Sequence, residues 1–362
     1  MWPYIFRRLI LIVPTLLGIM LINFLLVQFA PGGPIEQIIS EIKGNAVSAT
    51  ERIATTQGEV NMSSGSDNKL YRGAAGLDPD LIKKLEHQFG FDKPLLERFF
   101  LMMKNYVMFD FGESFFKGRR VIDLILDRMP ISISLGLWTM IIIYAISIPL
   151  GIMKAVKDGS RFDVWTSLII SVGSAIPAFL FAVLLIILFA GGSYWNWFPA
   201  RGLVSNNWQE LNWIEKILDY FWHLALPLTA LLVNSFAGLT LLTKNSFIEQ
   251  INMQYVMTAR AKGLKEKTVL YGHVFRNAML IVIAGFPGAF IGVLFTGSVL
   301  IEVIFSLNGL GLLGYEAAIN RDYPVMFGTL YFFTLLGLIL NIVGDICYTL
   351  VDPRINFEAL GK

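Results

Sequence analysis

The sequence is poor in the residue types that most enzymes and disulfide-stabilised proteins depend on. It has one cysteine and three histidines in 362 residues, and charged residues make up only 15% of it. The single cysteine, Cys347, excludes a framework of intrachain disulfides, and we interpret it as a small apolar residue in the last hydrophobic run. No HExxH motif and no GxxxxGK[ST] phosphate loop occurs, so the chain itself has neither a zinc-protease helix nor a P-loop ATP site.

Net charge is also small. The formal charge is +2, from 29 basic and 27 acidic residues, which gives no reason to expect a nucleic-acid partner. No cofactor is expected either. Hydrophobic residues, by contrast, make up 55% of the chain, which is more apolar surface than a soluble protein of this length hides. The composition therefore indicates an integral membrane protein.

Hydrophobic runs long enough to cross a bilayer recur along the chain. The first follows Arg7 and Arg8 and extends from Leu9 to about Ala30. It is longer than the core of a secretory signal and no small-x-small cleavage site follows it, so we expect an uncleaved anchor. Five further runs lie at residues 131–153, 165–190, 223–243, 278–304 and 325–350. The pattern predicts an all-α integral membrane protein with six transmembrane helices and a long extracytoplasmic loop after the first.

These runs divide the chain into four predicted parts. Residues 1–30 form the N-terminus and first span, and residues 31–130 form a polar loop or subdomain. Residues 131–350 form a core of five helices that contains a loop at 244–277, and residues 351–362 form a tail.

The second half of the polar loop shows helical spacing of apolar residues, as in Leu95, Phe99, Met102 and Met103. Short amphipathic helices there either lie on the membrane surface or pack inside a small subdomain. The spacing alone leaves both interpretations open.

Basic residues in the short loops predict the orientation in the membrane. They concentrate in the loop of Lys154, Lys157 and Arg161 and in the loop 244–277, whereas the loops 191–222 and 305–324 hold few. The basic loops fall on the side of Arg7. We therefore expect a multi-pass protein of a bacterial inner membrane with both termini in the cytoplasm.

The spans contain no obvious catalytic cluster. Two acidic residues, Glu302 and Asp345, lie near span ends, where a carboxylate can reach the interface or an interfacial partner, and we expect structural roles for both. The segment 309–314, GLGLLG, matches a dinucleotide-binding pattern but has no preceding strand. An ion-driven transporter, which needs intramembrane acids or inverted halves, a receptor-like protein and a membrane enzyme are the alternative hypotheses.

The loop 244–277 is long, basic and patterned for two short helices with a break at Gly263. Tyr255, Ala259 and Gly263 recur every four residues and so share a helix face, where small residues let another surface approach closely. Periodicity alone does not choose between a docking helix and a helix that lies on the membrane.

The residues of this loop, YVMTARAKGL followed by HVFRNA, resemble the coupling loop of permeases from binding-protein-dependent ABC importers, in the dipeptide and oligopeptide branch. Met257, Thr258 and Ala259 replace the general Glu-Ala-Ala, as is typical of that branch. Further similar segments cover nearly the whole chain: FRRL, APGGP, GFDKP, FDFGESF, IEVIF, RDYP and LVDPR. The sequence departs from this branch in two ways. Its segment at about 40–76 is longer than the outer loop usual in dipeptide permeases, and it has Gly33 where the branch often has Asp.

The resemblance implies a type I ABC importer permease fold and the import of peptides, oligopeptides or peptide-like compounds by alternating access. It implies four partners besides membrane lipid: a second homologous permease, P-loop ATPase domains in one fused chain or two, a periplasmic peptide-binding protein, and the peptide. A helix from about Ile248 to Gly263 would rest in a groove of the ATPase. Tyr255, Ala259 and Gly263 would make that contact, and Arg260 and Lys262 would supply charge.

Overall fold

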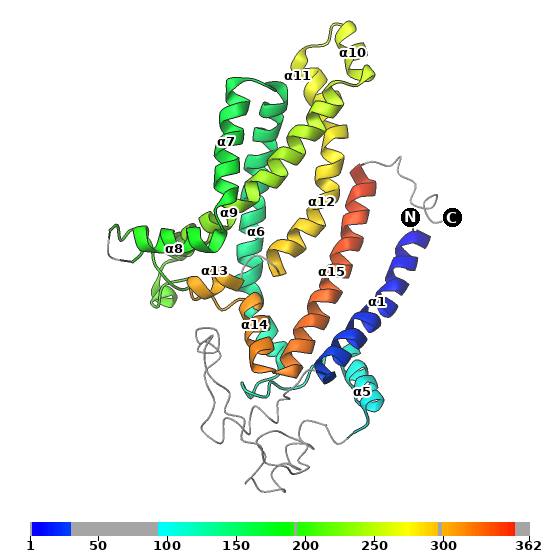
Figure 1. Cartoon of the computed structure of the whole chain (residues 1–362), viewed down its shortest axis with the longest axis vertical. Coiled ribbons are helices and arrows are strands. Elements are labelled where there is room, and N and C mark those ends of the chain that lie inside the picture. The colour runs from blue at the N-terminus through cyan, green and yellow to red at the C-terminus, as the bar shows by residue number, and fades with distance from the viewer. Residues whose placement is uncertain (1, 30–92, 192–193, 296–298, 352–362) are drawn as a thin grey trace, which may run out of the picture. The chain divides into compact units, whose positions relative to one another are not determined.

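The computed structural model describes residues 2–29, 93–191, 194–295 and 299–351 (Figure 1). Within these ranges the chain is helical, and its only β pairing is an isolated bridge between Glu113 and Arg120. The all-α prediction is confirmed.

The helices follow one another along the chain in the order of their labels. Their bounds are α1 Trp2–Phe29, α5 Leu95–Val107, α6 Val121–Val156, α7 Arg161–Ala175, α8 Ala178–Phe189, the 3₁₀ turn η1 Trp208–Glu210, α9 Trp213–Ile251, α10 Gln254–Ala261, α11 Glu266–Val269, the π turn η2 Leu270–Val274, α12 Phe275–Phe295, α13 Val299–Ile304, α14 Leu310–Asn320 and α15 Tyr323–Val351.

Among the described residues, 5 helices are long and apolar enough to cross a membrane, and the pair α7 and α8 brings the number to 6 if it counts as one span. These two helices meet at an angle of 90°. The break has a local cause, because Pro177 disfavours helical geometry at the residue before it, and Ile176 is extended at φ −84° and ψ 121°. The hydrophobic run 165–190 is therefore a bent pair and not one straight helix.

The chain divides into two compact units. Unit 1 comprises Met1–Arg8, Arg128–Leu312 and Leu336–Lys362. One of its hydrophobic clusters joins α6, α8, α9 and α13 through buried residues such as Leu135, Ala182, Leu224 and Ile301. A second cluster joins the ends of α6 and α9 to α10, α11 and α12.

Close helix contact in unit 1 depends on one glycine in particular. A Cβ atom at Gly151 of α6 would lie 2.7 Å from Cβ of Thr243 and 2.9 Å from the carbonyl oxygen of Thr240, both on α9. Gly285 and Gly288 of α12 have open space where a Cβ would be. Tight helix packing thus explains the glycine at position 151 but not those at positions 285 and 288.

Unit 2 comprises Leu9–Asp127 and Leu313–Leu335 and has an aromatic core. Tyr106 of α5 contacts Phe111 edge-to-face at 5.0 Å between ring centroids, and contacts Tyr331 of α15 at 5.4 Å. A Cβ at Gly328 would lie 2.7 Å from Val121. Glycine at this position therefore lets the start of α6 approach α15 closely.

Candidate functional site

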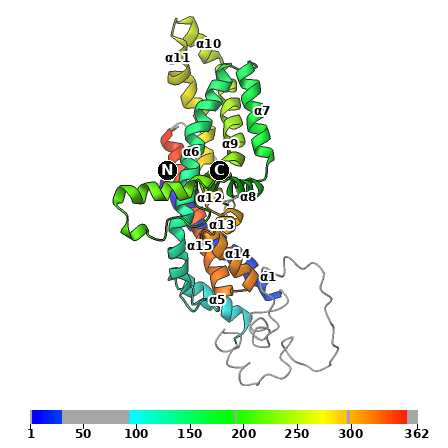
Figure 2. The same ribbon diagram turned by 90° about the vertical axis from the view of Figure 1, so that its left-hand side faces the viewer.

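The loop 244–277 forms a compact helical projection in unit 1. α10 and α11 lie beyond the ends of α9 and α12 in Figure 1, and Figure 2 shows the same arrangement from the side. Between the two short helices Gly263 adopts φ 78°, a conformation that costs most other residues energy. The structure thus has the two short helices and the break that the sequence pattern predicts.

The first of these helices is shorter than expected. α9 continues to Ile251, and α10 begins at Gln254 after a break at Asn252 and Met253. The prediction of one loop helix from about Ile248 to Gly263 is wrong in this respect, because Ile248 belongs to the end of α9.

One face of α10 is buried within the chain's own core. Val256 has no exposed surface and Ala259 only 8%, and both belong to the cluster that contains Phe247, Val269 and Val274. This burial fixes α10 to the ends of α9 and η2, because apolar surface removed from water holds the parts together. The projection is therefore a rigid part of unit 1.

The five residues predicted to contact a partner fall on different sides of the projection. Tyr255 is half-buried against the same cluster, and its hydroxyl donates a hydrogen bond to Oε1 of Gln250 at 3.0 Å. Ala259 faces the interior with 8% of its surface exposed, and its predicted contact with a partner stays a prediction. Arg260 and Lys262 are exposed, as is Gly263.

The exposed face of α10 holds a residue that the sequence reasoning missed. Met257 is 63% exposed, and Arg260 beside it pairs with Glu266 at 2.9 Å. Sequence reasoning selected the face that carries small residues, but those residues pack inward here. The signal that was available is the second apolar stripe of Met253 and Met257.

A buried ionic cluster lies where the α6–α7 turn meets α9. Lys154 of α6 has no exposed surface and lies 2.9 Å from Oδ1 of Asp163. Lys244 of α9 lies 2.7 Å from Oδ2 of Asp163 and 2.8 Å from Asp158. Two loops predicted to share one side of the membrane are thus joined by charge pairs within unit 1.

The first helix and the end of the last described helix also meet within unit 1. Arg8 lies 2.8 Å from Oδ2 of Asp345, and the hydroxyl of Tyr4 donates to the same oxygen at 3.2 Å. Asp345 thus has the ionic partner that its predicted structural role requires.

Glu302 is fully buried, so its carboxylate meets partners within the protein and does not reach the membrane interface. Its Oε2 accepts a hydrogen bond of 2.7 Å from the backbone N–H of Leu312, in the first turn of α14. The neighbouring N–H of Leu310 donates to Ser132 on α6 at 2.8 Å. A carboxylate at a helix N-terminus is stabilised by the free N–H groups and by the helix dipole. Glu302 therefore ties α13 to α14, which is a structural role.

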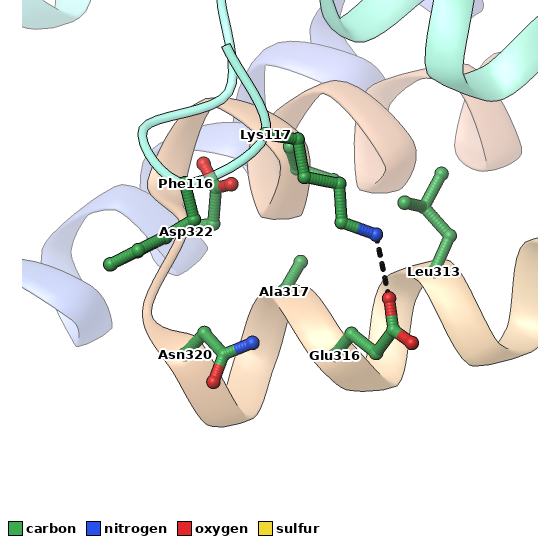
Figure 3. Close-up of a pocket in the computed structure, with 8 residues that line it drawn as sticks. Phe116, Lys117, Leu313, Glu316, Ala317, Asn320 and Asp322 are labelled. Carbon is green, nitrogen blue, oxygen red and sulfur yellow. Dashed lines mark hydrogen bonds and ion pairs between the residues drawn. The ribbon is translucent and has the colours of Figure 1, made fainter. Parts of the chain in front are cut away.

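A shallow pocket lies in unit 2, between the segment before α6 and the α14–α15 turn. Figure 3 shows Lys117 reaching toward Glu316, with the ammonium 2.7 Å from Oε2 of that carboxylate. Asp322 is buried and accepts hydrogen bonds from the hydroxyl of Ser114 at 2.5 Å and the N–H of Phe115 at 3.2 Å. These charges are satisfied within the protein. In the part of the chain that the structure describes, no three His, Cys, Asp or Glu side chains group as a metal site would require.

Together these features define a multi-pass helical membrane protein whose distinctive surface is a rigid, basic projection. The family described as "Binding-protein-dependent transport system inner membrane component" matches residues 147–357. The chain belongs to this family. The predicted type I ABC importer permease fold is thereby confirmed.

Full-length relatives agree with this family. The chain is 63% identical to "Peptidoglycan transport system permease protein YejB" of Agrobacterium fabrum strain C58 over 99% of both chains. It is 59% identical to "Inner membrane ABC transporter permease protein YejB" of Escherichia coli O157:H7, over 99% of this chain and 100% of that one. "Oligopeptide transport system permease protein AppB" of Bacillus subtilis strain 168 is 33% identical, with 99% and 100% covered.

Among solved structures there is a distant likeness to the inward-facing MetNI methionine ABC transporter, at a TM-score of 0.49 and 16% identity over 64% of this chain and 97% of that chain. The family assignment does not depend on it.

The family establishes that this chain is a multi-pass inner-membrane component of an importer and not an enzyme. ATP hydrolysis belongs to a separate subunit. This confirms the conclusion drawn from the missing phosphate loop.

Proposed function

We propose that this chain is the permease subunit of an ATP-driven importer that moves peptides, oligopeptides or peptide-like compounds across the bacterial inner membrane. The observation that carries the proposal is the full-length similarity to permeases named for oligopeptide and peptidoglycan transport. A periplasmic binding protein would deliver the peptide, and a second homologous permease would complete the path.

The exposed face of α10 is the proposed contact with the ATPase. Met257 offers an exposed apolar side chain, and Lys262, directly after the last residue of α10, offers an exposed positive charge. Val256 and Ala259 pack the other face of α10 into the core. A displacement of α10 by the ATPase would therefore move the ends of α9 and α12 with it. Such transmission is what alternating access requires, since the partner must bind the two conformations of the permease differently.

The proposed orientation places α10 and both termini in the cytoplasm. It is supported by the ion pair of Arg8 with Asp345, which brings the start of α1 and the end of α15 together in unit 1. It is supported also by the cluster of Lys244 with Asp158 and Asp163, which brings two basic loops together.

Copurification tests the docking face. The protein would be isolated in mild detergent from its native membrane, with Met257→Arg as the test variant and Thr268→Arg as the control, since Thr268 is exposed on α11. We expect a P-loop ATPase and a second permease with the original chain and with the control, and loss of the ATPase with Met257→Arg. If no ATPase accompanies the original chain, the proposal that this chain itself docks the ATPase fails. If Met257→Arg retains the ATPase, the docking face is misassigned.

Uptake by the reconstituted assembly tests the substrate class. Vesicles that contain the assembly, with ATP inside and the binding protein outside, would be offered a labelled oligopeptide and a labelled soluble peptidoglycan fragment. Accumulation of either one only in the presence of ATP supports the proposal. Failure of both, with an intact assembly that hydrolyses ATP, would contradict a peptide-like substrate.

A further inference from the structure

α5 has two apolar stripes side by side, and among the described residues only one of them is buried by packing. At 100° per residue, Phe99, Met103 and Tyr106 fall on one stripe, and all three are buried. The adjacent stripe carries Leu96, Phe100 and Val107, which are 70%, 66% and 69% exposed. The sequence left open whether this helix packs in a subdomain or lies on a membrane, and the structure shows that one stripe packs while the other faces outward.

The packed stripe contacts two membrane spans near one end of each, within unit 2. The ring of Phe99 lies 5.5 Å from that of Phe24, five residues before the end of α1 at Phe29. The ring of Tyr106 lies 5.4 Å from that of Tyr331, eight residues after the start of α15 at Tyr323. At 1.5 Å per residue both contacts lie within about 12 Å of a helix end, so α5 is near the boundary between hydrocarbon and headgroups and not near the bilayer centre.

The third face of α5 carries its charged residues, together with Leu101, which is 42% exposed. Glu97 and Lys104 are exposed and lie opposite the packed stripe, and Arg98 extends over the ring of Phe24 with its guanidinium carbon 5.9 Å from the ring centroid. A helix with a wide apolar arc and a charged face has the pattern of an element that lies in the plane of the membrane interface.

The last turns of α1 expose apolar side chains at the same level. Ile22 and Leu26 are 59% and 64% exposed on a helix that spans the membrane, so they face lipid or a neighbouring span. The part of α1 that α5 contacts through Phe24 is thus itself apolar on its exposed side. An occupant that covers both apolar surfaces is more readily lipid than a water-soluble partner.

We propose that α5 is an interfacial helix, and that the stripe of Leu96, Phe100 and Val107 inserts into the leaflet that meets the C-terminal end of α1. Lys104 and Lys93 then lie at the level of the lipid phosphates, where cationic side chains are favoured. Lipid is the occupant of this surface, and α5 fixes the depth at which the first span ends.

The single cysteine makes a direct test practical. In a Cys347→Ser background, one cysteine at a time replaces Leu96, Phe100 or Val107, with Glu97→Cys and Lys104→Cys as matched controls on the same helix. Each variant carries a nitroxide label in vesicles of bacterial phospholipid, and its collision rates with oxygen and with a water-soluble nickel chelate are measured. We expect oxygen to dominate at the stripe and the nickel chelate to dominate at both controls.

Two results would overturn the proposal. A higher nickel rate at the stripe would mean that the stripe is in water, and low rates for both reagents would mean that protein covers it. Because a variant could misfold, only those that elute as a single species in detergent are scored. A photoreactive phospholipid provides a second measurement, since it must label a peptide that contains Phe100 and not one confined to the α14–α15 turn.

Discussion

Lys154 and Asp163 form an ion pair of 2.9 Å in which the lysine has no exposed surface. The ammonium also donates to the hydroxyls of Thr166 and Ser167, at 2.9 and 2.7 Å, and so links α6 to α7. Lys244 brings α9 into the same cluster. A buried charge without a partner is far more costly than a buried pair, so the three helix ends are held together as one unit.

Replacing Asp163 by alanine should destabilise the protein strongly. The change leaves two lysines without their shared carboxylate, and losing one partner of a buried pair costs about 3–5 kcal/mol. Thermal unfolding of the purified protein in detergent would measure the effect as a lower transition temperature.

The matched control for this change is Asp127→Ala. Asp127 pairs with Arg119 at 2.6 Å, but both side chains are more than half exposed, and such pairs contribute about 0–1 kcal/mol. Equal loss of stability in the two variants would show that the cluster is not buried in the folded protein.

Gly309→Ala should disturb the start of α14. A Cβ at Gly309 would overlap the carboxylate of Glu302, which has no free space to move into. We expect lower stability and faster amide exchange at Leu312, because the hydrogen bond from that N–H to Glu302 would be lost. Gly314→Ala is the control, since open space surrounds that position; an effect at Gly314 as large as at Gly309 would contradict the explanation.

Gly151→Ala should separate α6 from α9. The added methyl carbon would lie 2.9 Å from a backbone carbonyl oxygen of α9, which cannot move without the helix, and overpacking of this kind costs about 1–3 kcal/mol. Gly238→Ala on α9 meets nothing within 4 Å, so its unfolding temperature should stay the same or rise. The prediction fails if the two alanine variants unfold alike.

Gly263 should tolerate asparagine better than valine. Its positive φ is left-handed backbone, which Asn adopts more readily than a β-branched residue, and a Cβ there meets no neighbour within 4 Å among the described residues. We expect Gly263→Asn to retain stimulation of ATP hydrolysis by the binding protein and Gly263→Val to reduce it. Equal stimulation in both variants would mean that the backbone of this turn has no role in coupling.

The helical class and the long hydrophobic runs could be predicted because span length follows directly from bilayer thickness. The helix at Leu95–Val107 could be predicted as well, since its apolar spacing is clear. The bend at Pro177 is invisible to hydropathy, because α7 and α8 together are as apolar as one straight span.

The site was harder to predict than the fold. A helix with apolar residues on two faces gives no sign of which face meets the chain's own core, and for α10 that core is made by Phe247, Val269 and Val274. Glu302 posed the same difficulty, since Ser132, one of the residues that surround it, lies 170 positions away. The burial of both groups depends on tertiary contacts that local spacing does not encode.

α9 has 39 residues, so at 1.5 Å per residue it is about 58 Å long, roughly twice the hydrocarbon thickness of a bilayer. Pro227 interrupts this length, because a proline inside a helix removes one backbone hydrogen bond and bends the helix there. The 24 residues from Leu228 to Ile251 are about 36 Å long, and a tilt of about 5° around one end of such a segment moves the other end by about 3 Å. A small rotation imposed where α9 meets α10 is therefore enough to shift the proline turn by about the length of two carbon–carbon bonds.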